Sequence, residues 1–307
     1  ASGEFKYAVV EYSSYGIYFA GIRERLLKVE ESVIRYNSDY GIRGVRGSDN
    51  NNYNASISVT NTQIVDNYRH GIHEGNDSYA KWEITDCTIS NNGEAGIRLE
   101  RSQSQVLKNN IIKKNKYGVY LGENNWDSQS WRELSGNEIS ENIDFGCEIR
   151  QMSGNQNEGN VEKINNNKIN SNGGAGLLFH NWHYCNLEVK GNEIKNNNGE
   201  GFALYENLRA SLVFDGNVIE DNNGQGVYFN GIKGDVLIQN NIIKRNYYSG
   251  IYVNKYEDDS TEVVIKNNVV SGNKRSNETR DENGITLNYK SSATAKITGN
   301  TVEDGGG

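Results

Sequence analysis

A glycine followed by alternating hydrophobic residues, in the form G-[IVLFC]-x-[hydrophobic], recurs about every 25 residues along the chain. A second pattern, hydrophobic-x-x-N-x-[IV]-x-x-N, precedes the glycine. Self-similarity at this period is typical of solenoids, in which each repeat contacts only its neighbours. The repeat therefore decides which side chains stack on one another. The repeated glycines are Gly16, Gly41, Gly71, Gly96, Gly118, Gly146, Gly176, Gly201, Gly226, Gly250 and Gly284.

Residues 187–204 illustrate one coil, because three short extended segments there each turn hydrophobic side chains to one side. The first segment alternates Leu187 and Val189 with polar residues, as a strand with one buried face does. The second places Ile194 inward, and the third, which follows the glycine, places Leu204 inward. No stretch of the chain follows the 3.6-residue period of a helix. The sequence predicts an all-β fold with three short strands per coil.

Two columns of asparagine mark the turns between these strands. Asparagine tolerates the left-handed backbone of a sharp turn. Identical amides stacked about 4.8 Å apart can also bond to each other along the stack. We therefore interpret the asparagines as structural. The first column contains Ser32, Thr62, Cys87, Asn110, Asn137, Asn167, Asn192, Asn217, Asn241, Asn268 and Asn300. The second column contains Asn37, Asn67, Asn92, Asn115, Asn142, Asn172, Asn197, Asn222, Asn246 and Asn273.

The motif N-x-I-x-x-N-x-x-x-G-I-x-L, which Asn192 to Leu204 approximates, resembles the repeat of right-handed parallel β-helix proteins of the pectin-lyase-like superfamily. The resemblance covers essentially the whole chain. It implies one parallel β-helix solenoid domain over residues 1–307, with about eleven coils of three short strands. It does not specify a function, because the superfamily includes pectate lyases, alginate epimerases and lyases, polygalacturonases, copper-maturation proteins, tailspikes and non-catalytic surface proteins.

Composition limits the partners. Hydrophobic residues make up only 35% of the 307 residues, which suits a thin solenoid. The net charge of −8 argues against nucleic acid and against anionic membranes, and we expect no membrane insertion. A polyanionic glycan would need bridging cations, so calcium stays open although no cofactor is predicted. The cysteines, Cys87, Cys147 and Cys185, are odd in number and lack metal-ligand spacing, so we interpret them as buried fillers.

The chain enters a coil almost at once and ends right after one. Because bare strand edges invite association, natural solenoids normally carry capping elements at their ends. We therefore expect a fragment of a larger extracellular or cell-surface protein. End-to-end or lateral self-association is a further expectation from the same observation.

The residue between the two inward hydrophobic residues of each G-I-x-L segment points outward. Around Tyr120 this face combines phenol, imidazole, guanidinium and carboxylate groups. Tyrosine or histidine can act as base and acid in β-elimination, while arginine neutralises a uronate carboxylate. The candidate catalytic residues are Tyr120, Tyr117, His73, Arg98, Glu148 and Arg150. The outward row reads Tyr18, Arg43, His73, Arg98, Tyr120, Glu148, Leu178, Ala203, Tyr228, Tyr252 and Thr286.

Aromatic residues gather in the loops after this strand. Tryptophan and tyrosine rings bind sugars through their apolar faces, with polar neighbours taking the hydroxyl groups. The alternative is that these rings cover the outside of the sheet as loop packing. The candidate sugar-binding residues are Trp126, Trp131, Trp182, His180, His183 and Tyr205.

No metal site is predicted. The 4 histidines form two pairs, His70 with His73 and His180 with His183, four coils apart and unable to share a metal. The first pair would need Glu74, which occupies a normally inward position.

The catalytic patterns of the superfamily's enzymes are missing from the sequence. No outward column of aspartates resembles the calcium sites of pectate lyases or the catalytic cluster of polygalacturonases. The Asp-Pro-His sequence of alginate epimerases is absent, because the chain contains no proline. We therefore expect a domain that contacts polysaccharide through an exposed Tyr/His/Arg face in a binding or scaffold role. The alternatives are a polysaccharide lyase, epimerase or hydrolase, and a structural filament, sheath or stalk segment.

Overall fold

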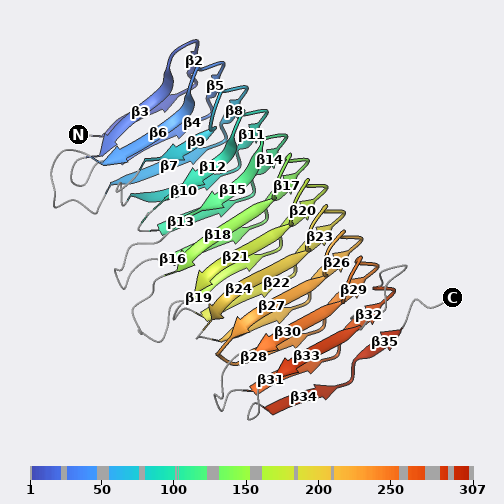
Figure 1. Ribbon diagram of the computed structural model, residues 1–307. Helices are drawn as coiled ribbons and strands as arrows, with labels where there is room; N and C mark the ends of the chain where they lie inside the picture. Colours follow the sequence, from blue (N-terminus) through green and yellow to red (C-terminus); the bar gives the residue numbers. More distant parts are fainter. Residues whose placement is uncertain are drawn as a thin grey trace.

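The computed structural model confirms the parallel β-helix. It describes residues 2–21, 26–46, 55–75, 80–100, 102, 104–122, 131–152, 161–182, 186–208, 211–255, 262–273, 284–289 and 294–303. Over these ranges every regular element is a β-strand, and all strand pairs lie in three parallel sheets. Figure 1 shows the coils stacked along one axis, from the blue N-terminal coil to the red C-terminal coil.

Each full coil contributes one strand to each sheet, as the three-strand repeat predicted. Sheet 1 has 12 strands: β1 (Gly3–Lys6), β4 (Leu26–Glu30), β7 (Ser56–Thr60), β10 (Lys81–Thr85), β13 (Ser104–Lys108), β16 (Trp131–Ser135), β19 (Val161–Asn165), β22 (Asn186–Lys190), β25 (Leu212–Asp215), β28 (Val236–Gln239), β31 (Glu262–Lys266) and β34 (Thr294–Thr298). Sheet 2 also has 12: β2 (Val9–Glu11), β5 (Val33–Arg35), β8 (Gln63–Val65), β11 (Thr88–Ser90), β14 (Ile111–Lys113), β17 (Glu138–Ser140), β20 (Lys168–Asn170), β23 (Glu193–Lys195), β26 (Val218–Glu220), β29 (Ile242–Lys244), β32 (Val269–Ser271) and β35 (Thr301–Glu303). Sheet 3 has 11: β3 (Tyr15–Gly21), β6 (Tyr40–Arg46), β9 (Ile72–Glu74), β12 (Ala95–Leu99), β15 (Tyr117–Leu121), β18 (Cys147–Met152), β21 (Leu177–Trp182), β24 (Phe202–Leu208), β27 (Val227–Ile232), β30 (Ile251–Lys255) and β33 (Ile285–Tyr289).

One continuous core runs through the coils and is filled from all three sheets. The side chains predicted to point inward do so: Leu187, Ile194 and Leu204 are 2% exposed or less. Cys87 and Cys147 are buried fillers, as expected, and burial raises the pKa of the Cys87 thiol to about 12. Burial also raises the pKa of the Cys147 thiol. Cys185 lies outside the described residues.

The repeated glycine is required by the close approach of successive coils. A Cβ atom on Gly201 would lie 2.5 Å from Cγ2 of Ile219, 2.8 Å from the carbonyl oxygen of Gly226 and 2.9 Å from Nδ2 of Asn222. These atoms belong to a buried core side chain, to backbone and to a hydrogen-bonded amide, so none can move aside cheaply. The same motif glycine recurs in each coil because the same three groups recur in the next one.

Buried amide ladders join the coils, as the asparagine columns predicted. The side chain of Asn192 donates to Oδ1 of Asn217 at 2.9 Å and to the carbonyl of Ile164 at 2.7 Å. Its own Oδ1 accepts from both the side chain and the backbone N–H of Asn167 at 2.9 Å. The ladder asparagines are not the left-handed residues of the turns. The residue before each one takes that role, for example Gly191 at φ 64°.

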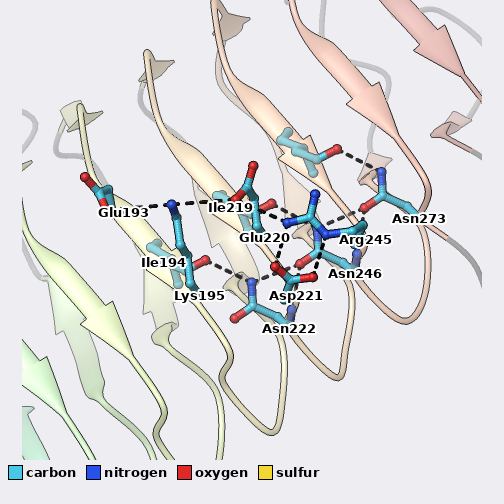
Figure 2. Close-up of polar contacts among 11 residues, drawn as sticks. Glu193, Ile194, Lys195, Ile219, Glu220, Asp221, Asn222, Arg245, Asn246 and Asn273 are labelled. Carbon is cyan, nitrogen blue, oxygen red and sulfur yellow. Dashed lines mark hydrogen bonds and ion pairs between the residues drawn. The ribbon is translucent and has the colours of Figure 1, made fainter.

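The second ladder lies beside a surface ion-pair cluster, which Figure 2 shows. Asn222 donates to Asn246, and Asn246 donates to Asn273, each at 2.9 Å. Next to the ladder, Nε and NH2 of Arg245 contact the two carboxylate oxygens of Asp221 at 2.7 Å each. These exposed pairs contribute little compared with the buried amides.

A buried polar chain interrupts the core near its N-terminal half. The hydroxyl of Ser102 donates to Glu74, and Nε2 of Gln105 donates to Ser102 at 3.1 Å. Nε of Arg132 donates to Oε1 of Gln105 at 2.6 Å, and the same guanidinium binds the carbonyl of Gly122. Gln105 and Arg132 occupy inward positions on β13 and β16, and inward parity on the first strand of each coil is the sequence signal that would have found them. Glu162, on the adjacent strand β19, is also buried. Burial raises the pKa of its carboxyl, and the positive charge of Arg132 opposes that rise.

Replacing Asn192 by alanine is expected to destabilise the protein by about 1–3 kcal/mol, because it leaves buried turn groups without partners. Asn198→Ala is the matched control: its amide accepts a similar bond from Asn223 at 2.9 Å, but it is exposed. Denaturant unfolding of both variants measures the difference. Equal losses would show that burial of the ladder amide is not what stabilises the turn.

Glu162 is expected to make stability depend on pH. Burial raises its pKa from 4.5 to about 7, although the charge of Arg132 opposes the rise. The folded state therefore holds this proton more tightly than the unfolded state does. Stability from this group is full below pH 4.5 and falls as the pH rises to about 7, by about 3 kcal/mol. Chemical unfolding of Glu162→Gln across this range is expected to show a smaller decline than the parent, and parallel profiles would contradict the assignment.

Candidate functional site

The outward side chains of sheet 3, here called the sheet-3 face, bring the predicted site residues into line. Strand register pairs His73 with Arg43 on one side and with Arg98 on the other. The next two coils pair Arg98 with Tyr120 and Tyr120 with Glu148. The outward row predicted from the repeat is therefore confirmed as a row of neighbours on adjacent strands.

A hollow of about 350 Å³ surrounds Tyr120. It opens where the small side chain of Ala95 occupies a row that holds an imidazole or a phenol in neighbouring coils. Five of the six candidate catalytic residues line it, and His73 does not. The lining residues include Ala95, Arg98, Tyr117, Tyr120, Glu148 and Arg150.

Tyr120 lies between two guanidinium groups in this hollow. The guanidinium carbon of Arg98 is 4.9 Å from the centre of its ring, and that of Arg150 is 5.6 Å away. Each arginine is also paired with a carboxylate. Nε of Arg98 donates to Glu100 at 2.7 Å, and Nε of Arg150 donates to Glu148 at 2.5 Å.

The electrostatics of the hollow keep Tyr120 protonated. Burial raises the pKa of its phenol, and the nearby arginines oppose this effect without reversing it. Burial would lower the pKa of Arg150, but the hydrogen bond and charge of Glu148 raise it overall. At neutral pH Tyr120 is thus a hydrogen-bond donor or an acid, and not a base.

A second hollow of about 480 Å³ lies over β6, β9 and β12, and its centre is two coils from that of the first. Arg98 borders both hollows. The ring of His73 packs against two others, Tyr40 at 4.7 Å and His70 at 4.9 Å between ring centres, and those two rings are 5.5 Å apart. The residues lining this hollow include Arg43, Arg69, His70, His73, Arg98 and Glu100.

The two histidines here are neutral. Burial, followed by the positive charge of Arg98 and Arg69, lowers the pKa of His70 to about 3. Burial lowers the pKa of His73 to about 3 as well, aided by His70 and the arginines. Nδ1 of His70 accepts the backbone N–H of Ala95 at 3.0 Å, and its Nε2 lies 2.9 Å from a Glu94 carboxylate oxygen. His70 is therefore a fixed structural residue.

A row of rings continues along the C-terminal half of the sheet-3 face. His180 stacks on Tyr205 at 5.4 Å, Tyr205 lies 5.3 Å from Tyr228, and Tyr228 lies 5.2 Å from Tyr252. Nε2 of His180 lies 3.4 Å from Oε1 of Glu148, so this row, here called the aromatic row, adjoins the first hollow. Burial raises the pKa of Tyr205 to about 12.

Sequence reasoning placed Tyr228 and Tyr252 on the outward face but did not include them in the site. Their recurrence at one position of successive coils was the signal. Trp126 and His183 lie outside the described residues. For Trp131 and Trp182 the structure gives only their places in β16 and β21 and no side-chain position.

Glu74 is the further ligand that a metal site at His70 and His73 would need. It is fully buried and points into the core, where it binds Ser102, so it does not join His70 and His73 on the outer face. Among the residues that the structure describes, no group of three or more His, Cys, Asp or Glu side chains is arranged to hold a metal. The same residues include no helix long and apolar enough to cross a membrane.

Comparison with known proteins identifies the class. The sequence matches the family model "Right handed beta helix region" over residues 1–161 and 153–307, so the chain belongs to this family. No curated protein sequence matches the chain.

Similar solved structures include the periplasmic alginate epimerase AlgG, at 14% identity and a TM-score of 0.56, with 93% of this chain and 76% of that chain covered. The A-module of the mannuronan C-5 epimerase AlgE4 of Azotobacter vinelandii is similar at 14% identity and a TM-score of 0.55, over 96% of this chain and 91% of that one. At such identities the likeness establishes the fold alone.

Proposed function

We propose that this β-helix binds polysaccharide along the sheet-3 face, in a binding or scaffold role. The observation that carries the proposal is the unbroken series of aromatic and charged side chains on consecutive coils, from Tyr120 through Glu148 and His180 to Tyr252. Coils about 4.8 Å apart are spaced much as sugar rings are along a chain, so successive coils can meet successive sugars. The polysaccharide epimerases of similar fold support a carbohydrate partner.

The aromatic row supplies suitable chemistry for such a partner. Neighbouring rings cover much of each other's faces, so their edges and polar atoms are the parts left for a ligand. The 55° angle between Tyr205 and Tyr228 uncovers part of a ring face, against which the CH groups of a sugar can pack. Phenol and imidazole groups can take part in hydrogen bonds with sugar hydroxyls. An exported location, extracellular or at the cell surface, suits this partner.

Binding without turnover is favoured by the pKa values of the two candidate bases. The pKa of Tyr120 is raised and that of His73 is lowered to about 3, so neither is matched to proton abstraction near neutral pH. Calcium as a bridging cation, and end-to-end or lateral self-association, stay predictions.

Tyr228→Ala is expected to weaken glycan binding about three- to tenfold, because it removes the centre of the aromatic row. Retention of the parent and the variant on a panel of immobilised polysaccharides measures the effect. Tyr36→Ala is the matched control, since Tyr36 stacks on Tyr12 at 5.6 Å but lies at a turn away from sheet 3. Equal weakening in both variants, or no retention of the parent on any glycan, would contradict the proposed function.

A lyase or epimerase is the second candidate, favoured by the proton-bearing Tyr120 between two arginines that can hold a uronate carboxylate. β-Elimination would create a carbon–carbon double bond that absorbs in the near ultraviolet, and proton exchange at C5 would report epimerisation by NMR. If the parent acts on uronate polymers, Tyr120→Phe is expected to lose most of the rate while binding survives. Full activity in Tyr120→Phe would place the chemistry elsewhere.

A further inference from the structure

The hollow over β6, β9 and β12 has a feature that the Tyr120 hollow lacks. Nε of Arg43 and Nδ1 of His73 are both buried, and neither has a hydrogen-bond partner among the residues that the structure describes. A buried polar atom without a partner is unfavourable, and such an atom in a native protein calls for an explanation. His70, in the same stack, has both ring nitrogens in polar contacts, so the absence is particular to His73.

Nε of Arg43 and Nδ1 of His73 lie on neighbouring strands at the same hollow. Arg43 and His73 are direct partners in the register of β6 and β9, and both line the 480 Å³ hollow. Gly75 also lines it and contributes no side chain to fill the space. Both nitrogens have almost no accessible surface, so a small group in the hollow reaches them when a neighbouring side chain shifts.

The arginines around this hollow differ in their carboxylate partners. Arg69 pairs with Asp39 and Glu94, and Arg98 pairs with Glu100. Arg43, by contrast, has no carboxylate partner among the residues that the structure describes. NH1 of Arg43 donates to the hydroxyl of Tyr15 at 3.1 Å, and its guanidinium lies over the rings of Tyr15 and Tyr40. Among the described residues, Arg43 is thus the arginine of this hollow that forms no direct ion pair, although the three carboxylates equal the three arginines in number.

We propose that this hollow is an oxyanion subsite, in which Arg43 and His73 bind a carboxylate or sulfate-ester group carried by the polysaccharide. That a polysaccharide carries this group rests on the proposed function, whereas the binding of an oxyanion rests on the residues of the hollow itself. A planar guanidinium beside a neutral imidazole N–H suits such a group, because both donate to oxygen and the guanidinium also supplies charge.

The subsite has a signature that a purely structural cluster lacks. Burial and the positive charge of the surrounding arginines hold the pKa of His73 near 3. A bound anion opposes that positive charge and so raises the pKa of His73. NMR of the histidine ring therefore reports occupancy directly.

The first experiment titrates the protein with sodium sulfate and, separately, with sodium acetate while the His73 ring signals are followed. In the parent we expect saturable shifts and a raised pKa of His73. Arg43→Gln is expected to weaken anion binding about tenfold or more. Arg245→Gln is the control: it removes the same charge from an exposed arginine beside the second ladder and should change binding less than about twofold (Figure 2). Arg43→Lys keeps the charge and tests the site if the glutamine variant folds poorly.

The second experiment measures binding of alginate, dextran sulfate and neutral dextran to the same variants. If Arg43→Gln loses binding to alginate and Arg245→Gln does not, the ligand is a carboxylate. If Arg43→Gln loses binding to dextran sulfate and Arg245→Gln does not, the ligand is a sulfate ester. Shifts with small anions but no retention of any polymer would keep the subsite and defeat the proposed function. No shift of His73 with either anion, together with equal polymer binding by Arg43→Gln and Arg245→Gln, would overturn the subsite.

Discussion

Hydrogen bonds between stacked amides inside the turns hold successive coils in register, and so set which side chains of the described strands lie next to one another. Each ladder asparagine receives bonds from the coil before it and gives bonds to the coil after it, so one coil cannot slip against the next without breaking several buried bonds at once. The close contact at Gly201 and its equivalents adds a steric lock to the same register. The line of Arg43, His73, Arg98 and Tyr120 on the outer face is a consequence of this register.

Much of this arrangement could be predicted from the sequence, because the repeat shows which side chains of each strand point inward and which point outward. The inward position of Leu204, the ladder at Asn192 and the outward row through Tyr120 all follow from one period. The repeat could not show which residue of a turn takes the left-handed backbone, because that depends on how the ladder amide is held. At Gly191 the structure answers this, with the left-handed residue just before the ladder asparagine.

The site was less predictable, because its properties depend on departures from the repeat. Ala95 does not stand out in the sequence, yet it lines the Tyr120 hollow in a row where the neighbouring coils carry rings. Glu74 stood out in the sequence, but its orientation into the core needed the bond to Ser102 to become clear. The unpartnered nitrogen of His73 depends on how its ring packs against Tyr40 and His70, and no spacing rule contains that information.

The regular register also gives the features of the sheet-3 face a fixed spacing. Features on it are separated by whole numbers of coils, so the spacing from the Arg43 hollow to Tyr252 is counted in repeats and not in loop lengths. Duplicating or deleting one complete coil between them would move the two features apart or together by one step while leaving the chemistry of each intact. In such a molecule, the number of coils sets the length of polysaccharide that can be bound, and this number can change in evolution without changing the residues that bind it.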